Sequence, residues 1–286
     1  MNKELERIFK QGSKTYSTSS LFFPESVRDD VVRLYAFVRT ADDFVDEIPA
    51  DPKGFLQFAN LYRNSLRSGP ADDLVIDSFI DLSRRYCLDE DWAEAFLKSM
   101  EWDLHINKYR TMAELIEYMV GSAEVIGLFM ARILGLPEEA DRYAQMQGRA
   151  MQLINFIRDI HEDQQLGREY LPEEDRRPGL LYQETANRYP MEFKQYIRDL
   201  IQVYREWQAE AQKGYKFIPR RYLIPIKTAA DMYVWTARAI EKDPFIVFER
   251  KVKPGKVRIF WRVFLNTLSA GRGGCEHAQQ NARSPW

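Results

Sequence analysis

The 286-residue sequence contains little cysteine and histidine, and this scarcity excludes several classes of protein. The two cysteines, Cys87 and Cys275, lie far apart, and neither belongs to a CxxC pair. We therefore expect no disulfide framework and no zinc site, as is typical of a protein in a reducing compartment. None of the three histidines follows a glutamate by three residues, so the Glu-x-x-His pattern of di-iron bundles is also missing.

The sequence also lacks an excess of charge of either sign and any long, uninterrupted hydrophobic run. Its formal net charge is −2, which gives no electrostatic basis for nucleic acid as a partner. The most apolar stretch, 118–136, contains Glu124 and Arg132, so we interpret it as an interior helix rather than a membrane span. The N-terminal residues show no hydrophobic signal segment, and we expect a cytoplasmic protein.

Strand-like alternation of apolar and polar residues is nearly absent, whereas helical periodicity recurs from Glu25, just after Pro24, to the region of Phe264. Further helices are expected over residues 54–67, 72–87, 89–106, 111–134, 138–165, 191–215, 225–242 and 256–268. The breaks between them are too short to be domain linkers. We predict one all-α domain over residues 1–268, with helices around a central cavity, and a disordered, glycine-rich tail over residues 269–286.

Two segments of the chain carry a line of residues on one helical face that ends in a pair of aspartates. Each line occupies positions i, i+3, i+7 and i+11, which fall within an arc of about 80° on a helix. The first line is Tyr35, Val38, Asp42 and Asp46, and the second is Gln152, Asn155, Asp159 and Asp163. Apolar residues surround the second line, so we expect that helix to be buried on its other sides.

A single Asp-x-x-x-Asp pair is most simply explained as a solvated helix face. Here the pair occurs twice, and Gln152 and Asn155 lie on the same face as the second pair. An arginine is close to each pair, Arg39 in the first segment and Arg158 in the second. Charge on an otherwise buried helix needs a partner inside the molecule. We therefore predict that the two aspartate faces oppose each other and form a cation site.

The residue types on these faces indicate which cation and substrate the site binds. Carboxylate and amide oxygens suit Mg²⁺ bound together with substrate phosphates, and Mn²⁺ can substitute for it. Arginine forks suit phosphate oxygens. The 15 tyrosines and 17 phenylalanines are enough for an aromatic tunnel, although most must be ordinary core residues. Together these features indicate ionisation of a prenyl diphosphate to an allylic cation. Aromatic ring faces stabilise such a cation by about 2 kcal/mol when water is excluded.

Several short motifs beyond the two lines resemble the squalene/phytoene synthase family of head-to-head prenyltransferases. They are Gly12-Ser-Lys-Thr-Tyr-Ser17, the aspartate segments 35–46 and 152–172, the segment 118–127, Ala229-Ala-Asp-Met-Tyr233 and Phe248-Glu-Arg250. The resemblance covers most of the chain, from about residue 9 to residue 250. It implies an isoprenoid-synthase-type helical bundle and an Mg²⁺-dependent transferase that acts on prenyl diphosphates. The Gly-Ser-Ala pattern at residues 121–123 resembles prokaryotic phytoene synthases in particular.

The resemblance also implies roles for individual residues. The expected Mg²⁺ ligands are Asp42, Asp46, Asn155, Asp159 and Asp163. The expected diphosphate or substrate contacts are Gly12, Ser13, Lys14, Thr15, Arg39, Gln152, Arg158, Tyr233 and Arg250. Tyr35 and Tyr118 are expected to border the reacting carbons.

The reaction implied by the resemblance has two halves. One allylic diphosphate ionises, the double bond of a second molecule attacks its C1, and proton loss gives a cyclopropylcarbinyl diphosphate. That intermediate ionises and rearranges to a second cation. Loss of a proton from this cation gives phytoene or dehydrosqualene, whereas capture of hydride from NADPH gives squalene. We favour phytoene from geranylgeranyl diphosphate over products of farnesyl diphosphate, because Gly121 stands where squalene-type members commonly carry a tyrosine. NADPH is not expected, since no glycine-rich dinucleotide fingerprint opens a βαβ unit.

Three other functions stay open. A chain-elongating prenyltransferase would also use Asp42-Asp43-Phe-Val-Asp46, but its second motif should resemble DDxxD, whereas this chain has Asp159-Ile-His-Glu-Asp163. A class I terpene cyclase fits the flanking motifs poorly. A non-catalytic homologue that serves as an assembly factor is expected to have lost metal ligands, and this chain retains all of them.

The segment 251–264 mixes basic and apolar side chains in a way that indicates contact with a membrane surface. The basic residues are Lys251, Lys253, Lys256, Arg258 and Arg262, and the apolar ones are Val257, Ile259, Phe260, Trp261, Val263 and Phe264. Such a segment can lie on anionic lipid and help to release a lipophilic product. The alternative is an amphipathic helix that packs on the core with its basic face in water.

Overall fold

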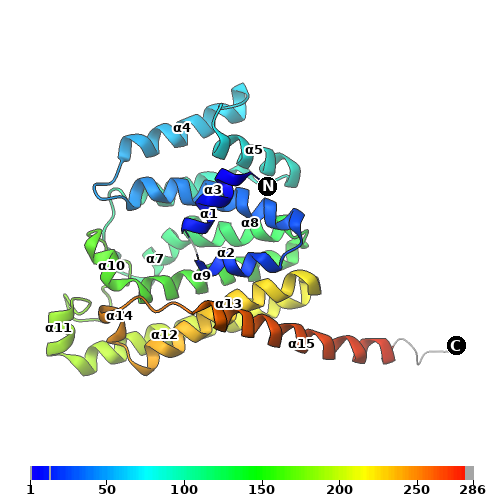
Figure 1. Ribbon diagram of the computed structural model, residues 1–286. Coiled ribbons are helices and arrows are strands. Elements are labelled where there is room, and N and C mark those ends of the chain that lie inside the picture. The colour runs from blue at the N-terminus through cyan, green and yellow to red at the C-terminus, as the bar shows by residue number, and fades with distance from the viewer. Residues whose placement is uncertain (1, 13, 281–286) are drawn as a thin grey trace.

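The protein is built almost entirely from helices that pack side by side (Figure 1). The computed structural model describes residues 2–12 and 14–280; within these ranges there is no strand, and one isolated bridge pairs Lys108 with Glu169. The α-helices are α1 (Lys3–Gly12), α2 (Lys14–Ser19), α3 (Glu25–Asp46), α4 (Pro52–Ser68), α5 (Leu74–Tyr86), α6 (Glu90–Trp102), α7 (Met112–Met119), α8 (Val125–Ile133), α9 (Asp141–Arg158), α10 (Ile160–Gln165), α11 (Gln183–Arg188), α12 (Pro190–Gln212), α13 (Arg220–Lys242), α14 (Ile246–Glu249) and α15 (Lys256–Gln280). The predicted all-α class is confirmed.

Capping side chains fix where several of these helices begin. Asp51 accepts a hydrogen bond from the backbone of Gly54 at the start of α4, and Asp73 accepts two from the first turn of α5. Thr111 caps α7 in the same way. Each cap satisfies backbone N–H groups that have no partner within the helix. The predicted starts of these helices agree closely with the observed ones because the caps are visible in the sequence.

The core lies between the helices that pack around α3 and α9. Phe37 of α3 is fully buried and stacks on Phe79 of α5, with ring centroids 3.9 Å apart. On α9, Leu153, Ile154 and Ile157 are each 0 % exposed, and α8 and α12 pack against this helix. The helix of the second aspartate line is therefore buried on its apolar sides, as predicted. Full burial of one such side chain contributes about 1.5–3 kcal/mol.

A cavity of about 300 Å³ lies between the central helices. Both α3 and α9 line it, together with α8, α13 and the segment around α2. Most of the lining side chains are apolar, and they include Leu34, Val38, Ile126, Met130, Met151 and Ile226. The predicted central cavity between the two aspartate-bearing helices is therefore present.

The second aspartate helix is interrupted, although the sequence predicts one helix over residues 138–165. A 3₁₀ turn, η3 (Glu138–Ala140), precedes α9, and Asp159 separates α9 from α10 with backbone angles φ −101° and ψ 14°. The backbone N–H of Asp163 still donates to the carbonyl of Asp159, at 2.8 Å. The two aspartates therefore stay one helical turn apart despite the break.

Two further helix predictions need correction. A π-helical turn, η2 (Val120–Glu124), interrupts the helix predicted over residues 111–134. The helix predicted to start at Pro225 starts at Arg220 instead, so Pro225 lies inside α13. Proline is usually excluded from a helix interior because it lacks an N–H group. Here it lies close to the start of α13, where the missing N–H removes only one backbone hydrogen bond.

Some elements differ from the expected pattern at the ends of the chain and in its loops. The helices α1, α2, α11 and α14 and the 3₁₀ turns η1 (Ser20–Phe22) and η4 (Lys213–Phe217) were not predicted as separate elements. The backbone over residues 269–280 is assigned as the end of α15, and the disordered tail expected over residues 269–286 stays a prediction. Glycine lowers helix propensity but permits helical backbone angles. Residues 281–286 lie outside the described residues, and the domain boundary at residue 268 stays a prediction.

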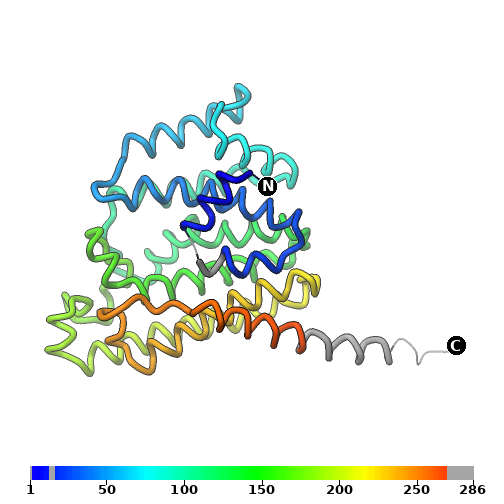
Figure 2. The backbone as a smooth tube through the Cα atoms, viewed as in Figure 1, coloured from blue at the N-terminus to red at the C-terminus, as the bar shows by residue number. Residues whose placement is uncertain are grey.

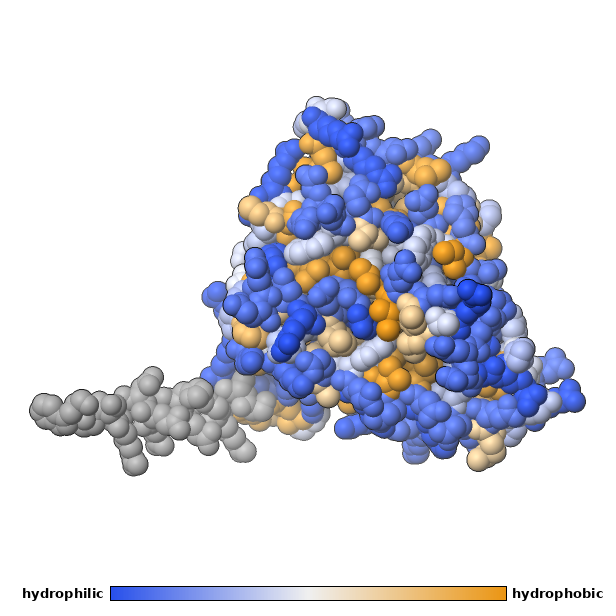
Figure 3. Space-filling model, turned by 180° about the vertical axis from the view of Figure 1, so that it is seen from behind, coloured by the Kyte–Doolittle hydropathy of each residue, from blue (hydrophilic) through white to orange (hydrophobic). Residues whose placement is uncertain are grey.

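The outer surface is shaped by helices at opposite ends of the bundle. The backbone tube shows α4 and α5 at one end and α15 at the other, where it packs along α13 (Figure 2). The face in Figure 3 is mainly hydrophilic, with hydrophobic residues gathered toward its middle. Over the part of the chain that the structure describes, no helix has the length and apolar character needed to span a membrane.

Candidate active site

The first aspartate pair lies at the C-terminal end of α3, where arginines hold both carboxylates. Arg39 donates through Nη1 to Asp42 Oδ2 at 2.7 Å and also pairs with Asp43. Arg168, which follows α10, donates through Nη1 to Asp46 Oδ1 at 2.7 Å. Burial, and after it the neighbouring Asp46 carboxylate, raises the pKa of Asp42 to about 8. Burial therefore disfavours the ionised form of Asp42 even with Arg39 bound to it.

The second aspartate pair lies at the junction of α9 and α10. Arg158 donates to both carboxylate oxygens of Asp159, from Nε at 2.7 Å and from Nη2 at 2.5 Å. Lys251, which follows α14, places its Nζ 3.0 Å from Asp159 Oδ1. Burial raises the pKa of Asp163 well above its ordinary value, and the charges of Asp159 and Asp46 raise it further. Because Asp46 belongs to α3, the two aspartate pairs lie close enough to influence each other.

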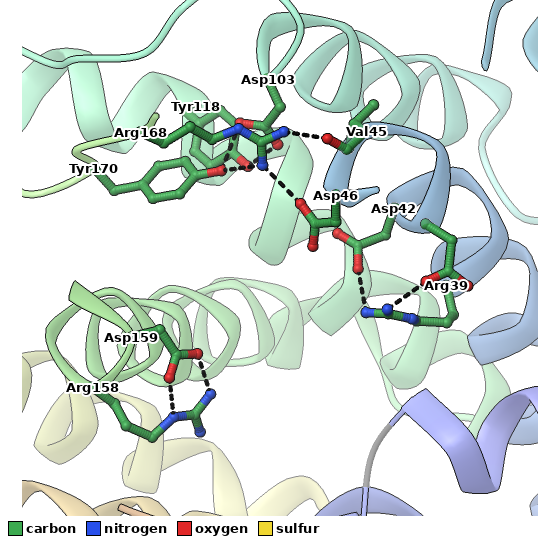
Figure 4. Close-up of polar contacts among 11 residues, drawn as sticks. Arg39, Asp42, Val45, Asp46, Asp103, Tyr118, Arg158, Asp159, Arg168 and Tyr170 are labelled. Carbon is green, nitrogen blue, oxygen red and sulfur yellow. Dashed lines mark hydrogen bonds and ion pairs between the residues drawn. The ribbon is translucent and has the colours of Figure 1, made fainter. Parts of the chain in front are cut away.

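The two aspartate pairs lie in the same part of the molecule. In Figure 4, Asp42 and Asp46 lie together on one side, near Arg39 and Arg168, and Asp159 lies apart from them with its carboxylate facing Arg158. The charge of Asp46 nevertheless raises the pKa of Asp163. That the two aspartate faces oppose each other around a cation stays a prediction.

The inner ends of the two lines reach the apolar cavity. Tyr35 and Val38 of α3 and Gln152 and Asn155 of α9 form part of its wall. The Tyr35 ring packs on Phe9, with centroids 4.6 Å apart. The aspartates come later along each line and lie beyond the lining residues. The site thus joins a charged end to a hydrocarbon-like chamber, which is the arrangement that an amphipathic substrate requires.

Asn155 carries an acceptor that needs a partner. Its Nδ2 donates to Gln152 Oε1 at 3.1 Å, but its Oδ1 is buried and has no hydrogen-bond partner among the described residues. A buried acceptor without a partner costs about 1–3 kcal/mol. Because Asn155 lies on the same helical face as Asp159, a cation bound near that carboxylate would satisfy the Asn155 oxygen.

The donor set fits Mg²⁺, although the carboxylates are not gathered around one point. In residues 2–12 and 14–280, no group of three or more His, Cys, Asp or Glu side chains is close enough together to hold a metal ion. The aspartates instead hold Arg39, Arg158, Arg168 and Lys251. Carboxylate and amide oxygens supplemented by water and substrate phosphate are the ligands that Mg²⁺ prefers. The residues present therefore fit the ion once phosphate oxygens complete its shell.

Of the predicted substrate contacts, Gly12 packs on Tyr35, and Tyr233 is close enough to influence its pKa. A Cβ atom on Gly12 would be 2.6 Å from the Tyr35 hydroxyl and 2.9 Å from Arg39 Cδ, so the end of α1 packs directly on these side chains. Tyr233 of α13 is buried. Burial raises the pKa of Tyr35, and Asp42 and Tyr233 add to the rise. Gly12 and Tyr233 are therefore neighbours of the expected site.

The other predicted contacts lie farther out or cannot be placed. Arg250 is exposed and directly precedes Lys251. Ser13 lies outside the described residues, as do the side chains of Lys14 and Thr15 at the start of α2. The roles of these four residues stay predictions.

Tyr118 is buried outside the lining of the cavity. It is 2 % exposed, is not among the residues that line the cavity, and donates its hydroxyl to Asp103 Oδ2 at 2.7 Å. Its expected place beside the reacting carbons stays a prediction. Asp103 also accepts from Tyr170, and Tyr170 accepts from Arg168 (Figure 4). Neither spacing nor the family resemblance assigns a role in the site to Asp103, Arg168, Tyr170 or Lys251. The one available signal was the segment 167–172, which directly follows the second aspartate line.

Gly121 lies at the closest approach of η2 to α6. A Cβ atom at this position would be 2.0 Å from the Ala95 carbonyl oxygen and 2.2 Å from Ser99 Oγ. The Ser99 hydroxyl donates to the Tyr118 carbonyl at 2.9 Å and thereby ties α6 to the chain just before η2. No larger side chain fits here without separating the two elements. The position at which squalene-type members commonly carry tyrosine is thus structurally closed in this chain.

Comparisons with known sequences agree with this geometry. A family profile described as squalene/phytoene synthase matches residues 9–258. The 15-cis-phytoene synthase of a Paracoccus species is 33% identical over 175 residues, an alignment that spans only 57% of each chain. The phytoene synthase of Rhodobacter capsulatus is 26% identical over 278 residues, which cover 92% of this chain and 80% of that protein. The 4,4'-diapophytoene synthase of Staphylococcus haemolyticus is 27% identical over 175 residues.

Solved structures share the fold. A dehydrosqualene synthase in complex with a ligand superposes with a TM-score of 0.84 at 21% identity, over 94% of this chain and 96% of that one. The squalene synthase HpnC from Alicyclobacillus acidocaldarius superposes with a TM-score of 0.76 at 22% identity, over 85% and 94% of the two chains. These similarities confirm the predicted helical bundle.

Proposed function

The chain belongs to the squalene/phytoene synthase family, and we propose that it condenses two molecules of geranylgeranyl diphosphate head to head to form phytoene. The family match and the relatives named phytoene synthase support a prenyltransferase over the other enzyme classes considered. The observation that carries the proposal is that the two helices that bear the aspartate pairs, α3 and α9, both line an apolar cavity. A prenyl diphosphate has the same division into a polyanionic head and a hydrocarbon chain.

The charged end can receive the diphosphate by an exchange of partners. Each aspartate pair now holds cationic side chains, above all Arg39 on Asp42 and Arg158 on Asp159. We propose that Asp42, Asp46, Asn155, Asp159 and Asp163 hold Mg²⁺ when the substrate binds. The arginines are then free to donate their paired N–H groups to phosphate oxygens. Bound Mg²⁺ supplies Lewis-acid neutralisation of the diphosphate leaving group.

The apolar cavity directs the chemistry after the C1–O bond breaks. The diphosphate leaves with the bonding electron pair, and the allylic carbon becomes a cation. Tyr35 lines the cavity and belongs to the first aspartate line, which supports our proposal that its ring stabilises positive charge near C1. The cavity wall excludes water, which would otherwise capture the cation and give an alcohol.

The carbon–carbon bond then forms between the two substrates. The C2–C3 double bond of the second molecule attacks C1 of the cation, and loss of a proton closes a cyclopropane ring while the second diphosphate stays attached. Departure of that diphosphate allows the ring to rearrange, and loss of a second proton gives the central triene. No reductant is consumed, so we propose that the reaction needs no NADPH.

Product analysis tests this proposal. Purified protein is incubated with Mg²⁺ and either geranylgeranyl or farnesyl diphosphate, with and without NADPH, and the hydrocarbon products are identified by mass spectrometry. We expect phytoene from geranylgeranyl diphosphate, unchanged by NADPH and absent when EDTA removes the metal. Squalene formed only with NADPH, or dehydrosqualene as the main product, would assign a different branch of the family. A non-catalytic assembly factor would release neither hydrocarbon nor diphosphate.

We also propose that this cytoplasmic enzyme contacts an anionic membrane through α15. Its exposed apolar residues share one helical face about 100° wide; they are Val257, Phe260, Trp261, Phe264 and Leu268. Ile259 and Val263 are buried on the opposite side, where α15 packs on α13. Lys253 and Lys256 are exposed near the start of the same helix. An apolar face beside lysines is complementary to a bilayer with acidic headgroups.

Liposome flotation tests the membrane contact. We expect the protein to float with vesicles that contain phosphatidylglycerol but not with pure phosphatidylcholine vesicles, and Trp261→Glu with Phe264→Glu to abolish flotation. Met191→Glu is the matched control, because Met191 is 72 % exposed on α12. Absence of flotation at low salt would refute the membrane contact and leave the proposed reaction untouched.

A further inference from the structure

A buried polar network lies behind Asp46, and the proposed reaction makes no use of it. Its centre is Asp103, which directly follows α6 and is 8 % exposed. Tyr118 donates to Asp103 Oδ2 and Tyr170 donates to Asp103 Oδ1, both at 2.7 Å. Each carboxylate oxygen of Asp103 therefore accepts from one tyrosine hydroxyl. The single carboxylate group fixes the positions of both hydroxyls relative to each other.

The tyrosine rings are held in place by an aromatic cluster. Tyr170 stacks on Phe156 with centroids 4.4 Å apart and lies 5.3 Å from the Tyr118 ring. Tyr109 lies 5.4 Å from Tyr118 and 6.0 Å from Tyr170. Packing on several sides restricts the rings to one rotamer, so the hydroxyl positions are set before any substrate arrives.

Arg168 connects this network to the aspartate pair of α3. Its Nη1 lies 3.2 Å from the Tyr170 hydroxyl and 2.7 Å from Asp46 Oδ1. Its Nη2 donates to the Val45 carbonyl at 2.5 Å. The Arg168 side chain is 7 % exposed, whereas that of Asp46 is 33 % exposed. The arginine is therefore fixed from the inside, and Asp46 presents the free side of its carboxylate to the site.

We propose that Asp103 is a positioning residue. Acting through Tyr170 and Arg168, it holds the Asp46 carboxylate in the orientation that binds a divalent cation. This inference rests on the proposed function, because it takes Asp46 as a ligand of the diphosphate-bound ion. Removing a side chain that hydrogen-bonds to a metal ligand commonly lowers metal affinity by about 10–100-fold. Tyr118 has the same kind of role here, since it anchors the other oxygen of Asp103.

Isothermal titration of pyrophosphate, with and without Mg²⁺, tests the inference without depending on turnover. Tyr170→Phe removes the link between Asp103 and Arg168 but keeps the stacked ring. We expect this variant to weaken Mg²⁺-dependent pyrophosphate binding by about tenfold. Asp103→Asn should do the same, and thermal unfolding identifies any variant that fails to fold. Tyr109→Phe is the matched control, because the Tyr109 hydroxyl belongs to the same cluster and has no hydrogen-bond partner among the described residues.

A double-mutant cycle with Asp46→Asn separates the possible outcomes. If Tyr170 acts through Asp46, Tyr170→Phe will cause no further loss of affinity in the Asp46→Asn background. The positioning role would be overturned if Tyr170→Phe lowered pyrophosphate affinity equally in the wild-type and Asp46→Asn backgrounds. It would also be overturned if Tyr170→Phe bound pyrophosphate as tightly as Tyr109→Phe does. Neither result would affect the proposed metal site. If wild-type protein binds pyrophosphate equally well without Mg²⁺, the proposed function itself fails.

Discussion

At the scale of single residues, the site is defined by aspartates whose present partners are basic side chains. Asp42, Asp46 and Asp159 each hold an arginine, and Asp159 also holds Lys251. Burial raises the pKa of both Asp42 and Asp163 and so disfavours their ionised form in the absence of a bound cation. We propose that a divalent cation arriving with an anionic substrate stabilises these carboxylates and leaves the arginines for the substrate.

The first residue-scale prediction concerns the aspartates themselves. Asp42→Asn and Asp159→Asn are each expected to lower kcat by about 10²-fold or more, because each removes a proposed ligand of the Mg²⁺ that would neutralise the departing diphosphate. Asp42→Asn should leave the melting temperature nearly unchanged, since asparagine avoids burying a charge. The measurement is product formation with thermal unfolding alongside, and Asp199→Asn on the exposed side of α12 is the control. Near-wild-type rates in both site variants would contradict the metal assignment.

The second residue-scale prediction concerns the shape of the Arg39 side chain. Arg39→Lys keeps the charge but loses the planar fork that now reaches both Asp42 and Asp43. We expect pyrophosphate binding in the presence of Mg²⁺ to weaken about tenfold, as for the loss of one charge-assisted hydrogen bond. Arg33→Lys on the same helix is the control, because Arg33 pairs with Asp81 instead. Equal affinities for the two variants would remove Arg39 from the substrate site.

At the scale of helices, the two aspartate lines follow from local sequence, but their surroundings depend on tertiary packing. Spacing alone predicted that Asp42 and Asp46 share a face, and α3 confirms it. Spacing could not predict the break at Asp159. The Asp163 N–H still donates to the Asp159 carbonyl, so the helical spacing of the side chains continues across the break. Likewise, Arg168 reaches Asp46 across 122 positions of sequence, and no local pattern reports such a contact.

Close packing between η2, α8 and α9 gives the element-scale prediction. A Cβ atom on Gly148 would lie 2.2 Å from the Ala123 carbonyl oxygen, and one on Gly127 would lie 2.1 Å from the Ala144 carbonyl oxygen. Gly148→Ala should therefore separate α9 from η2 and cost about 1–3 kcal/mol of unfolding free energy. Urea denaturation measures this cost, with Gly255→Ala as the control because a Cβ atom there meets nothing within 4 Å. Equal stability of both variants would show that the helices can move apart freely.

At the scale of the whole molecule, the bundle places both aspartate-bearing helices against one apolar cavity. Composition and periodicity predicted the all-α class and the central cavity, because both depend on the average pattern of many residues. The detailed wall did not follow from sequence, since residues from α1 to α13 contribute to the site and only the fold brings them together. Tyr118 illustrates this limit, because its packing on Tyr170 and its hydrogen bond to Asp103 join residues that are far apart in the sequence.

The most direct test of the central claim is a crystal structure of the protein with Mg²⁺ and a non-reactive thio-analogue of geranylgeranyl diphosphate. The account predicts Mg²⁺ ions between the Asp42–Asp46 and Asp159–Asp163 pairs, diphosphate oxygens on Arg39 and Arg158, and the prenyl chain in the cavity beside Tyr35. A complex in which the aspartates keep their present arginine partners, with diphosphate bound elsewhere and no metal between the pairs, would contradict it.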